Sequence, residues 1–89
     1  MAAKLLYRDA QGRDAAVNLP ETGSFLGRAV DCIIRTDDAM VSRKNCKISF
    51  INARWYVEDL GSANGTFINE RRISRDELNH GDVIRCGSL

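Results

Sequence analysis

Short apolar runs recur along the whole chain, and polar or turn-forming residues separate them. The clearest alternation is Cys46-Lys47-Ile48-Ser49-Phe50, in which every second residue is apolar, so one face of a strand meets a core and the other meets water. Similar runs, rich in β-branched and aromatic residues, occupy residues 5–7, 15–19, 24–26, 32–34, 46–50, 55–57, 66–68 and 83–86. These eight runs, spaced at intervals of about ten residues, predict an all-β sandwich or barrel.

The segments between the runs contain turn-forming residues rather than helical patterns. Asn52-Ala53, Asn64-Gly65 and Asn69-Glu70 each separate two apolar runs. No segment keeps the helical spacing of apolar residues over three turns. Helix is therefore disfavoured. The one place where a helical turn would fit is residues 75–78, because Ser74 and Glu77 have the spacing of a capping box, a spacing that is common by chance.

The length of 89 residues allows one domain, and the composition is that of a folded protein. Hydrophobic residues make up 44% and charged residues 28%, which excludes the low-hydrophobicity composition of a disordered chain. We therefore expect a single domain at residues 1–89. The final apolar run stops at Gly87-Ser88-Leu89, so we expect a longer chain with the last strand cut short here. Because Met1 falls just before the first apolar run, we expect this domain to be the amino-terminal module of that chain.

The sequence contains no segment that would carry the protein into or across a membrane. No apolar run approaches the roughly 20 residues that a membrane-spanning helix needs. The start, Met1-Ala2-Ala3-Lys4, lacks the apolar core of a signal peptide. We therefore expect a cytoplasmic protein without a membrane partner.

Few residues in the chain are suited to catalysis or metal binding. Cys32, Cys46 and Cys86 are an odd number at wide spacing, which fits buried thiols better than disulfides or a zinc knuckle. The single histidine, His80, lies in a turn-like stretch and has no recognisable partner for metal ligation or nucleophilic catalysis. We therefore expect no enzyme, no metal and no cofactor.

The positive charge of the chain is local. The net charge of +1 excludes a protein that binds polyanions through an overall basic surface. Residues 39–57 nevertheless contain no acidic residue and four cations, Arg43, Lys44, Lys47 and Arg54. Two of these cations follow Ser42 just before an apolar run, which predicts a basic loop. A nucleic-acid interface on this segment is disfavoured, because the segment lacks a series of exposed aromatic residues.

Two further loops have the composition of binding loops. In the first, Gly27 directly precedes Arg28 at the end of an apolar run, and an arginine there can project its fork of donors. The second, residues 59–66, reads Asp-Leu-Gly-Ser-Ala-Asn-Gly-Thr and has the composition of a tight inter-strand loop, which by turn chemistry alone is a hairpin. Asn64 in that loop has an amide that can both donate to and accept from another chain's backbone.

Taken together and in order, these segments resemble a forkhead-associated (FHA) domain over about residues 4–89. The matching segments are Gly27-Arg28, residues 42–46, residues 59–69, and Leu78 with residues 81–84 and Gly87. The resemblance implies an all-β fold, an FHA-like β-sandwich of two twisted sheets with about eleven short strands and its binding loops at one end. It also implies a module that recognises phosphothreonine in an extended peptide and does no chemistry.

The resemblance further implies specific roles for the residues of these loops. Arg28 would contact the phosphate, Ser42 would donate its hydroxyl to the same phosphate, and Arg43 would add further contacts, with Lys44 as a supporting cation. Asn64 would hydrogen-bond the peptide backbone, and Ala63 would line the site beside it. The partner would be a threonine-phosphorylated protein or peptide, such as a Ser/Thr kinase or its substrate, bound in phosphorylation-dependent signalling.

The sequence departs from the family at one loop position. Asn45 stands where FHA domains usually have a histidine that braces the loops, and an asparagine can replace only part of that brace. This departure and the short last strand leave an alternative open. The chain would then be an FHA-fold assembly domain that binds a partner independently of phosphate.

Overall fold

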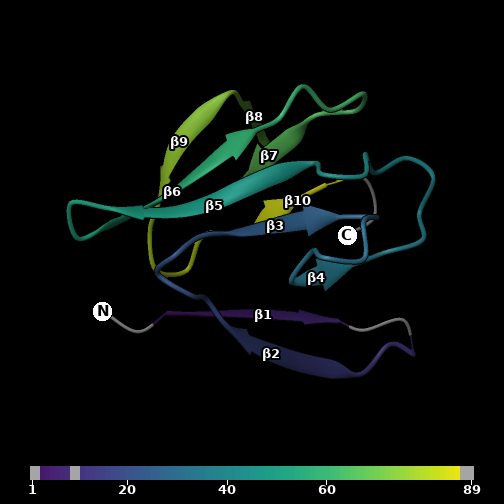
Figure 1. Cartoon of the computed structure of the whole chain (residues 1–89), viewed down its shortest axis with the longest axis horizontal. Coiled ribbons are helices and arrows are strands. Elements are labelled where there is room, and N and C mark those ends of the chain that lie inside the picture. Colours follow the sequence, from purple (N-terminus) through teal and green to yellow (C-terminus); the bar gives the residue numbers. More distant parts are fainter. Residues whose placement is uncertain (1–2, 9–10, 87–89) are drawn as a thin grey trace.

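The computed structural model describes residues 3–8 and 11–86, and these residues form ten β-strands and no helix. In chain order the strands are β1 (Lys4–Arg8), β2 (Asp14–Asn18), β3 (Ser24–Gly27), β4 (Ile34–Arg35), β5 (Cys46–Ile51), β6 (Arg54–Asp59), β7 (Thr66–Ile68), β8 (Arg71–Ile73), β9 (Arg75–Leu78) and β10 (Ile84–Arg85). Figure 1 shows their arrangement.

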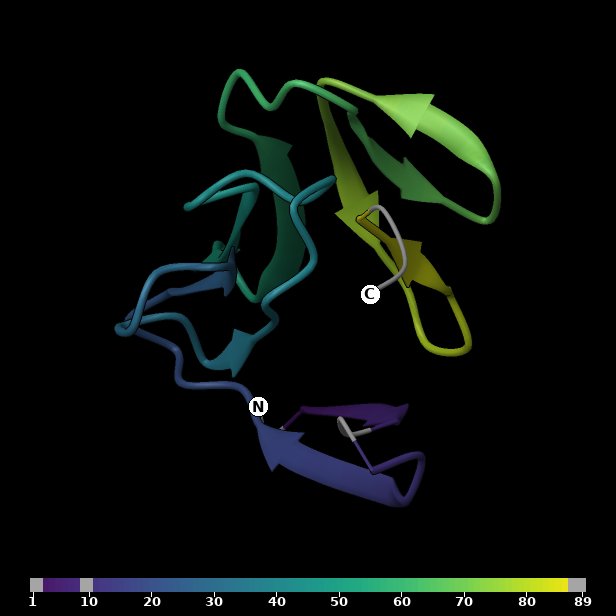
Figure 2. The same cartoon turned by 90° about the vertical axis from the view of Figure 1, so that its right-hand side faces the viewer.

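The strands form three sheets. One has five strands in the order β4-β3-β5-β6-β9, one has three in the order β10-β7-β8, and β1 pairs with β2 as a separate hairpin. All pairs are antiparallel except β3 with β4. Figure 2 shows the three-stranded sheet beside the five-stranded sheet, with the β1–β2 hairpin below both. The fold is therefore an all-β sandwich, as the alternating pattern predicts.

A single hydrophobic core lies between the sheets. The five-stranded sheet and its loops contribute Leu26, Ile34, Val41, Cys46, Ile48 and Val57, and the other side contributes Leu19, Ile68, Ile73 and Cys86. Along β5, Cys46 and Ile48 are fully buried while Lys47 and Ser49 are less buried, which is the alternation expected of a half-buried strand. The cysteines at positions 32, 46 and 86 are all buried, as the sequence predicts.

Two hairpin turns follow directly from the sequence. Asn52 and Ala53 connect β5 to β6 with φ angles of 52° and 64°, and Asn69 and Glu70 connect β7 to β8 with φ angles of 51° and 65°. Positive φ at both central residues is what a two-residue hairpin turn requires, because it matches the twist of the flanking strands. Both turns lie at positions where the sequence predicts one.

The one helical turn that the sequence allowed, at residues 75–78, does not form. These residues form β9, which pairs with β6 from Glu58↔Arg75 to Trp55↔Leu78. Hydrogen bonding along the free edge of β6 therefore outweighs the local capping-box spacing. Because no helix occurs among residues 3–8 and 11–86, none there could span a membrane.

The structure contains two strands that the apolar runs do not predict. One is β9, and the other is β8, which the pattern does not indicate because Arg71 and Arg72 precede its one buried residue, Ile73. The resemblance implied about eleven strands, and ten lie within the described ranges. The predicted shortening of the last strand concerns residues 87–89, which lie outside those ranges.

Candidate functional site

Three loops meet at one end of the sandwich because of the strand directions. Since β3 and β4 are parallel, both end at the same edge of the sheet. Since β5 and β6 are antiparallel neighbours, β5 begins at that edge and β6 ends there. The β3–β4 segment (28–33), the β4–β5 loop (36–45) and the β6–β7 loop (60–65) therefore lie together, and they are called here the loop cluster. In Figure 2 this end of the molecule faces the viewer.

Backbone hydrogen bonds fix the segment after β3 against the β4–β5 loop. The amide N–H of Arg28 donates to the carbonyl of Ser42 at 3.2 Å, and that of Ala29 donates to the carbonyl of Arg43 at 2.9 Å. The Nε of Arg28 also donates to the carbonyl of Val41 at 2.6 Å. A side chain at Gly27 would come within 2.7 Å of the Ser42 carbonyl oxygen, so the close approach of the two segments requires glycine there.

Hydrogen bonds also fix the β6–β7 loop against the β4–β5 loop. The Ala63 amide N–H donates to Oγ of Ser42 at 3.1 Å, and Nδ2 of Asn64 donates to the carbonyl of Met40 at 2.7 Å. Ala63 and Asn64 are both exposed. Arg28, Ser42 and Asn64, which the sequence predicts to act together, therefore lie at the same end of the molecule, joined through one loop.

Asn45 braces the loop cluster from the inside. Its side chain is fully buried: Oδ1 accepts from the Ser42 amide at 3.0 Å, and Nδ2 donates to the Gly65 carbonyl at 3.1 Å and to Oγ1 of Thr66 at 2.9 Å. Its backbone carbonyl accepts from Leu60 at 3.1 Å. Asn45 thus uses all of its amide groups to join two loops, so the brace that the sequence left in question is present.

Asp59 anchors the β6–β7 loop, a role that the sequence reasoning missed. Its carboxylate accepts from the amides of Gly61 and Ser62, both at 3.1 Å, and from the hydroxyls of Ser62 at 2.5 Å and Thr66 at 2.8 Å. Burial alone raises the pKa of Asp59, but these hydrogen bonds outweigh it and hold the pKa below its usual range. The spacing Asp-x-Gly-Ser could have indicated this role, because an aspartate often accepts hydrogen bonds from the backbone amides two and three residues later.

The two adjacent cations of the β4–β5 loop differ in their surroundings. Arg43 is exposed, and within the described residues its guanidinium contacts no carboxylate. Lys44 instead pairs through Nζ with Asp31 at 3.2 Å and lies 4.5 Å from the centroid of the Phe25 ring. The charge of Lys44 is thus offset by a neighbour, while that of Arg43 is available to a ligand.

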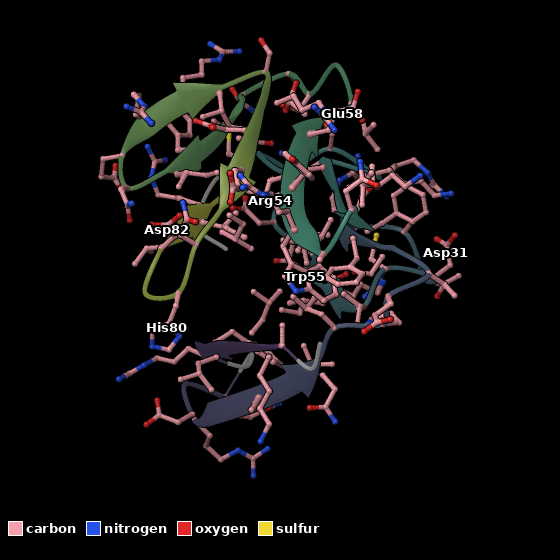
Figure 3. The ribbon with its side chains drawn as sticks, turned by 90° about the vertical axis from the view of Figure 1, so that its left-hand side faces the viewer. Asp31, Arg54, Trp55, Glu58, His80 and Asp82 are labelled. Carbon is pink, nitrogen blue, oxygen red and sulfur yellow. The ribbon has the colours of Figure 1, made fainter. Side chains whose placement is uncertain are left out.

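Of the residues suited to catalysis, His80 lies apart from the loop cluster, and the three cysteines are buried. His80 lies in the turn between β9 and β10, at the end of the molecule that faces the viewer in Figure 3, opposite to the loop cluster. Cys46 and Cys86 are buried, with 3.9 Å between their sulfur atoms. Across residues 3–8 and 11–86, no three His, Cys, Asp or Glu residues are grouped in a way that could hold a metal ion.

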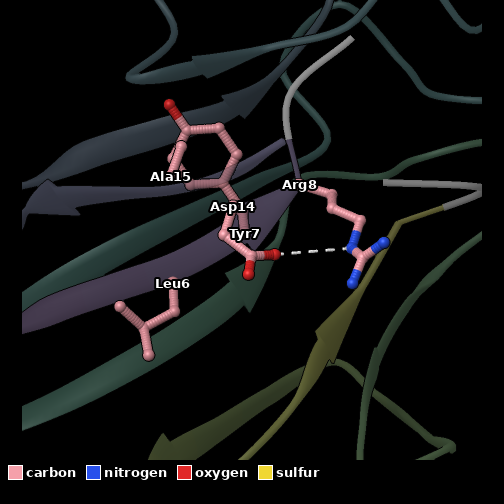
Figure 4. Close-up of a pocket in the computed structure, with 5 residues that line it drawn as sticks. All are labelled: Leu6, Tyr7, Arg8, Asp14 and Ala15. Carbon is pink, nitrogen blue, oxygen red and sulfur yellow. Dashed lines mark ion pairs between the residues drawn. The ribbon is translucent and has the colours of Figure 1, made fainter. Parts of the chain in front are cut away.

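A shallow pocket on the β1–β2 hairpin is separate from this site. Leu6, Tyr7, Arg8, Asp14 and Ala15 line it, and Arg8 pairs with Asp14 at 3.6 Å (Figure 4). Both charged side chains are largely exposed, and the lining contains no histidine, cysteine or serine. The pocket is therefore less suited to binding a charged ligand than the loop cluster.

Comparison with known proteins shows a family match that includes the loop cluster. The family model described as "FHA domain" matches residues 25–87, which include all three loops of the cluster. The chain belongs to the FHA domain family. Among curated relatives of this FHA domain, the glycogen accumulation regulator GarA of Mycobacterium tuberculosis is 36% identical over 88 residues, which cover 99% of this chain and 54% of GarA. This FHA domain thus spans about half the length of that relative.

Solved structures agree with the fold of this FHA domain. One, from a structural and functional analysis of phosphothreonine-dependent FHA domain interactions, has a TM-score of 0.80 and 34% identity, covering 97% of this chain and 86% of that one. The FHA domain of FhaA, complexed with the intracellular domain of Rv3910, has a TM-score of 0.81 and 33% identity, covering 98% and 92%. The all-β sandwich with its loops at one end is therefore the FHA fold.

Proposed function

We propose that this FHA domain binds phosphothreonine in an extended peptide through the loop cluster. The observation that carries the proposal is the convergence of Arg28, Ser42 and Asn64 around one loop, fixed by hydrogen bonds of 2.6–3.2 Å. The relatives add support, because one of them was solved as part of an analysis of phosphothreonine-dependent FHA interactions.

Local positive charge makes this site suitable for a phosphate. A phosphothreonine carries about −1.5 to −2 charges at pH 7 and three acceptor oxygens. Within the described ranges the Arg28 side chain makes its hydrogen bond through Nε, to the Val41 carbonyl, which leaves its NH1 and NH2 groups available. Arg43 has no carboxylate partner in the same ranges. The Ser42 hydroxyl accepts from Ala63, which leaves its own proton free to donate to a phosphate oxygen.

The peptide itself would be held beside the phosphate. Asn64 is exposed, and its Nδ2 is already fixed by the Met40 carbonyl, so the amide has a defined orientation before a ligand arrives. Its Oδ1 and second N–H can then bond the peptide backbone, with Ala63 beside it. Charge-assisted bonds, less the cost of ordering a flexible peptide, give an affinity in the micromolar range, about −8 kcal/mol.

The partner that fits this site is a threonine-phosphorylated protein, such as a Ser/Thr kinase or one of its substrates. The domain acts in this proposal as an interaction module that reads phosphorylation, without catalysis and without a cofactor. Lys44 contributes only long-range charge, because Asp31 already holds its ammonium group. The complete inner bonding of Asn45 favours phosphate reading over the phosphate-independent assembly domain.

Calorimetric titration with matched peptides tests the proposal. A threonine-phosphorylated peptide should bind, its unphosphorylated twin should not, and Arg28→Ala should abolish binding. Lys4→Ala is a matched control, because Lys4 is an exposed cation at the start of β1, away from the loop cluster. Equal binding of the two peptides would contradict the proposal and favour the phosphate-independent assembly domain.

A further inference from the structure

Several cations on this domain are paired with a carboxylate, and three arginines in or beside the loop cluster are not. Six cations have a carboxylate within 3.6 Å: Arg8, Arg35, Lys44, Arg54, Arg71 and Arg85. Arg75 instead lies 4.4 Å from the centroid of the Tyr56 ring. Within the described ranges, Arg28, Arg43 and Arg72 have neither a carboxylate nor an aromatic ring against the guanidinium. The proposed function uses Arg28 and Arg43 and leaves Arg72 unexplained.

Arg72 lies beside the loop that carries Asn64. It is on β8, and a Cβ built on Gly65 would lie only 2.8 Å from Nε of Arg72, so the two residues are in direct contact. Gly65 in turn follows Asn64 and accepts the amide of Asn45. Arg72 therefore flanks the β6–β7 loop, while Ser42 approaches that loop through Ala63.

The surroundings of Arg72 leave its charge unopposed. Its exposed side chain lies on the outer face of the three-stranded sheet, opposite Phe67 in the β7–β8 register. Arg85, on the other side of Phe67, is held by Glu70 at 3.0 Å and lies 4.1 Å from the centroid of the Phe67 ring. The carboxylate of the adjacent loop, Asp59, is occupied by Ser62 and Thr66. An anion approaching Arg72 thus meets a cation with no competing partner.

We infer that Arg72 is a specificity-determining residue that selects peptides with a carboxylate side chain near the phosphothreonine. This inference rests on the proposed function and adds a chemical preference to it. An extended peptide advances about 3.3 Å per residue, so side chains up to about four residues from the phosphothreonine reach about 13 Å to either side. The contact is an exposed ion pair between an aspartate or glutamate of the ligand and the Arg72 guanidinium, and it tunes affinity without replacing the phosphate contacts.

A peptide scan with a charge-neutral control tests the inference. For each position from four before to four after the phosphothreonine, two peptides are made that differ only there, one with Asp and one with Asn. Binding is measured calorimetrically at about 50 mM salt, where screening is weak. At one or two positions Asp should bind about threefold more tightly than Asn, the size of an exposed ion pair. This gain should vanish in Arg72→Gln and persist in Arg71→Gln, because Arg71 is already paired with Asp76 at 3.3 Å.

The outcomes separate this inference from the proposed function. The Asn peptides serve as the folding control, since their affinity should be the same for Arg72→Gln as for the unsubstituted domain. Phosphate-dependent binding without any Asp preference, or a preference that survives in Arg72→Gln, would overturn the inference and leave the proposed function standing. A uniform loss over all peptides in Arg72→Gln would also overturn it, because Arg72 would then act on every ligand alike. Binding that ignores the phosphate would overturn both.

Discussion

The side-chain amide nitrogen of Asn45 lies 2.9 Å from the hydroxyl oxygen of Thr66, in the buried space between the two larger sheets. Asn45 directly precedes β5 of the five-stranded sheet, and Thr66 begins β7 of the three-stranded sheet. The same Thr66 hydroxyl donates to Asp59 at 2.8 Å. One buried chain of hydrogen bonds therefore ties both sheets together directly behind the surface that we propose to bind the ligand.

Substitution of Asn45 should weaken both the fold and the site. Asn45→Ala leaves the Ser42 amide and the Gly65 carbonyl without their partners, and unpaired buried groups of this kind cost about 1–3 kcal/mol each. We expect the free energy of unfolding, measured by urea denaturation, to fall by about 3 kcal/mol. Asn79→Ala, at an exposed turn residue, should change it by less than about 0.5 kcal/mol. Equal effects of the two substitutions would contradict the role of Asn45 as a brace.

Substitution of Gly27 should weaken ligand binding, although Gly27 is a strand residue that is not proposed to touch the ligand. A Cβ there collides with the backbone carbonyls of Ser42 and Arg43, which cannot move without displacing the β4–β5 loop. Gly27→Ala should therefore lower the affinity for a phosphothreonine peptide at least tenfold, about 1.4 kcal/mol. In Gly12→Ala nothing lies within 4 Å of the new methyl group, so affinity should stay unchanged. Wild-type affinity in Gly27→Ala would show that the close approach of the two segments is dispensable.

Acid should destabilise the β6–β7 loop through Asp59. Because its hydrogen bonds lower the pKa of Asp59 in the folded state, its stabilising contribution is present above the unfolded-state pKa of about 3.9 and is lost as the pH falls through the folded-state value. The free energy of unfolding should fall as the pH is lowered from about 5 through the unfolded-state pKa and below it, and it should fall less in Asp59→Asn. Asp31 and Asp82 also have lowered pKa values, so the difference between the two proteins isolates Asp59. Parallel pH curves would rule out its anchoring role.

The buried thiol pair should resist alkylation in the folded domain. The hydrogen bond with Cys86 and burial both raise the pKa of the Cys46 thiol, so it stays protonated at neutral pH and lacks the reactive thiolate. The same hydrogen bond lowers the pKa of the Cys86 thiol, but Cys86 is only 1% exposed, so burial protects it. Iodoacetamide at pH 8, followed by mass mapping, should therefore label Cys46 and Cys86 only at the rate of global unfolding. The urea-denatured protein is the control and should be labelled fully. Fast labelling of either residue at native conditions would mean that the core opens locally.

The strands of the fold were predictable wherever apolar residues alternate or turn residues mark a hairpin. The run at 46–50 became β5, and Asn52-Ala53 became its hairpin turn. β8 and β9 were missed because their residues are largely charged, and their conformation depends on pairing with β7 and β6. Local sequence reports the burial of a residue better than it reports the neighbour with which an edge strand pairs.

The loop composition predicted which residues are grouped, and it did not predict how they are held. Asn64-Gly65 has the signature of a hairpin, yet the β6–β7 loop connects strands of different sheets, because β6 pairs with β9 and β7 pairs with β8. The sequence indicates a supporting role for the charge of Lys44, and only the fold shows that Asp31 pairs with it. The roles of Asp59 and Thr66 depend on contacts across seven residues of chain, which composition alone does not reveal.

A heteronuclear NMR titration with a single phosphothreonine peptide tests the central claim most directly. The amide resonances of Arg28, Ser42 and Asn64 should move together as the peptide is added, and those of Asn52 and His80, at the opposite end of the sandwich, should stay in place. The unphosphorylated peptide should move none of them. Shifts that cluster at the opposite end, or that appear equally with the unphosphorylated peptide, would contradict the account.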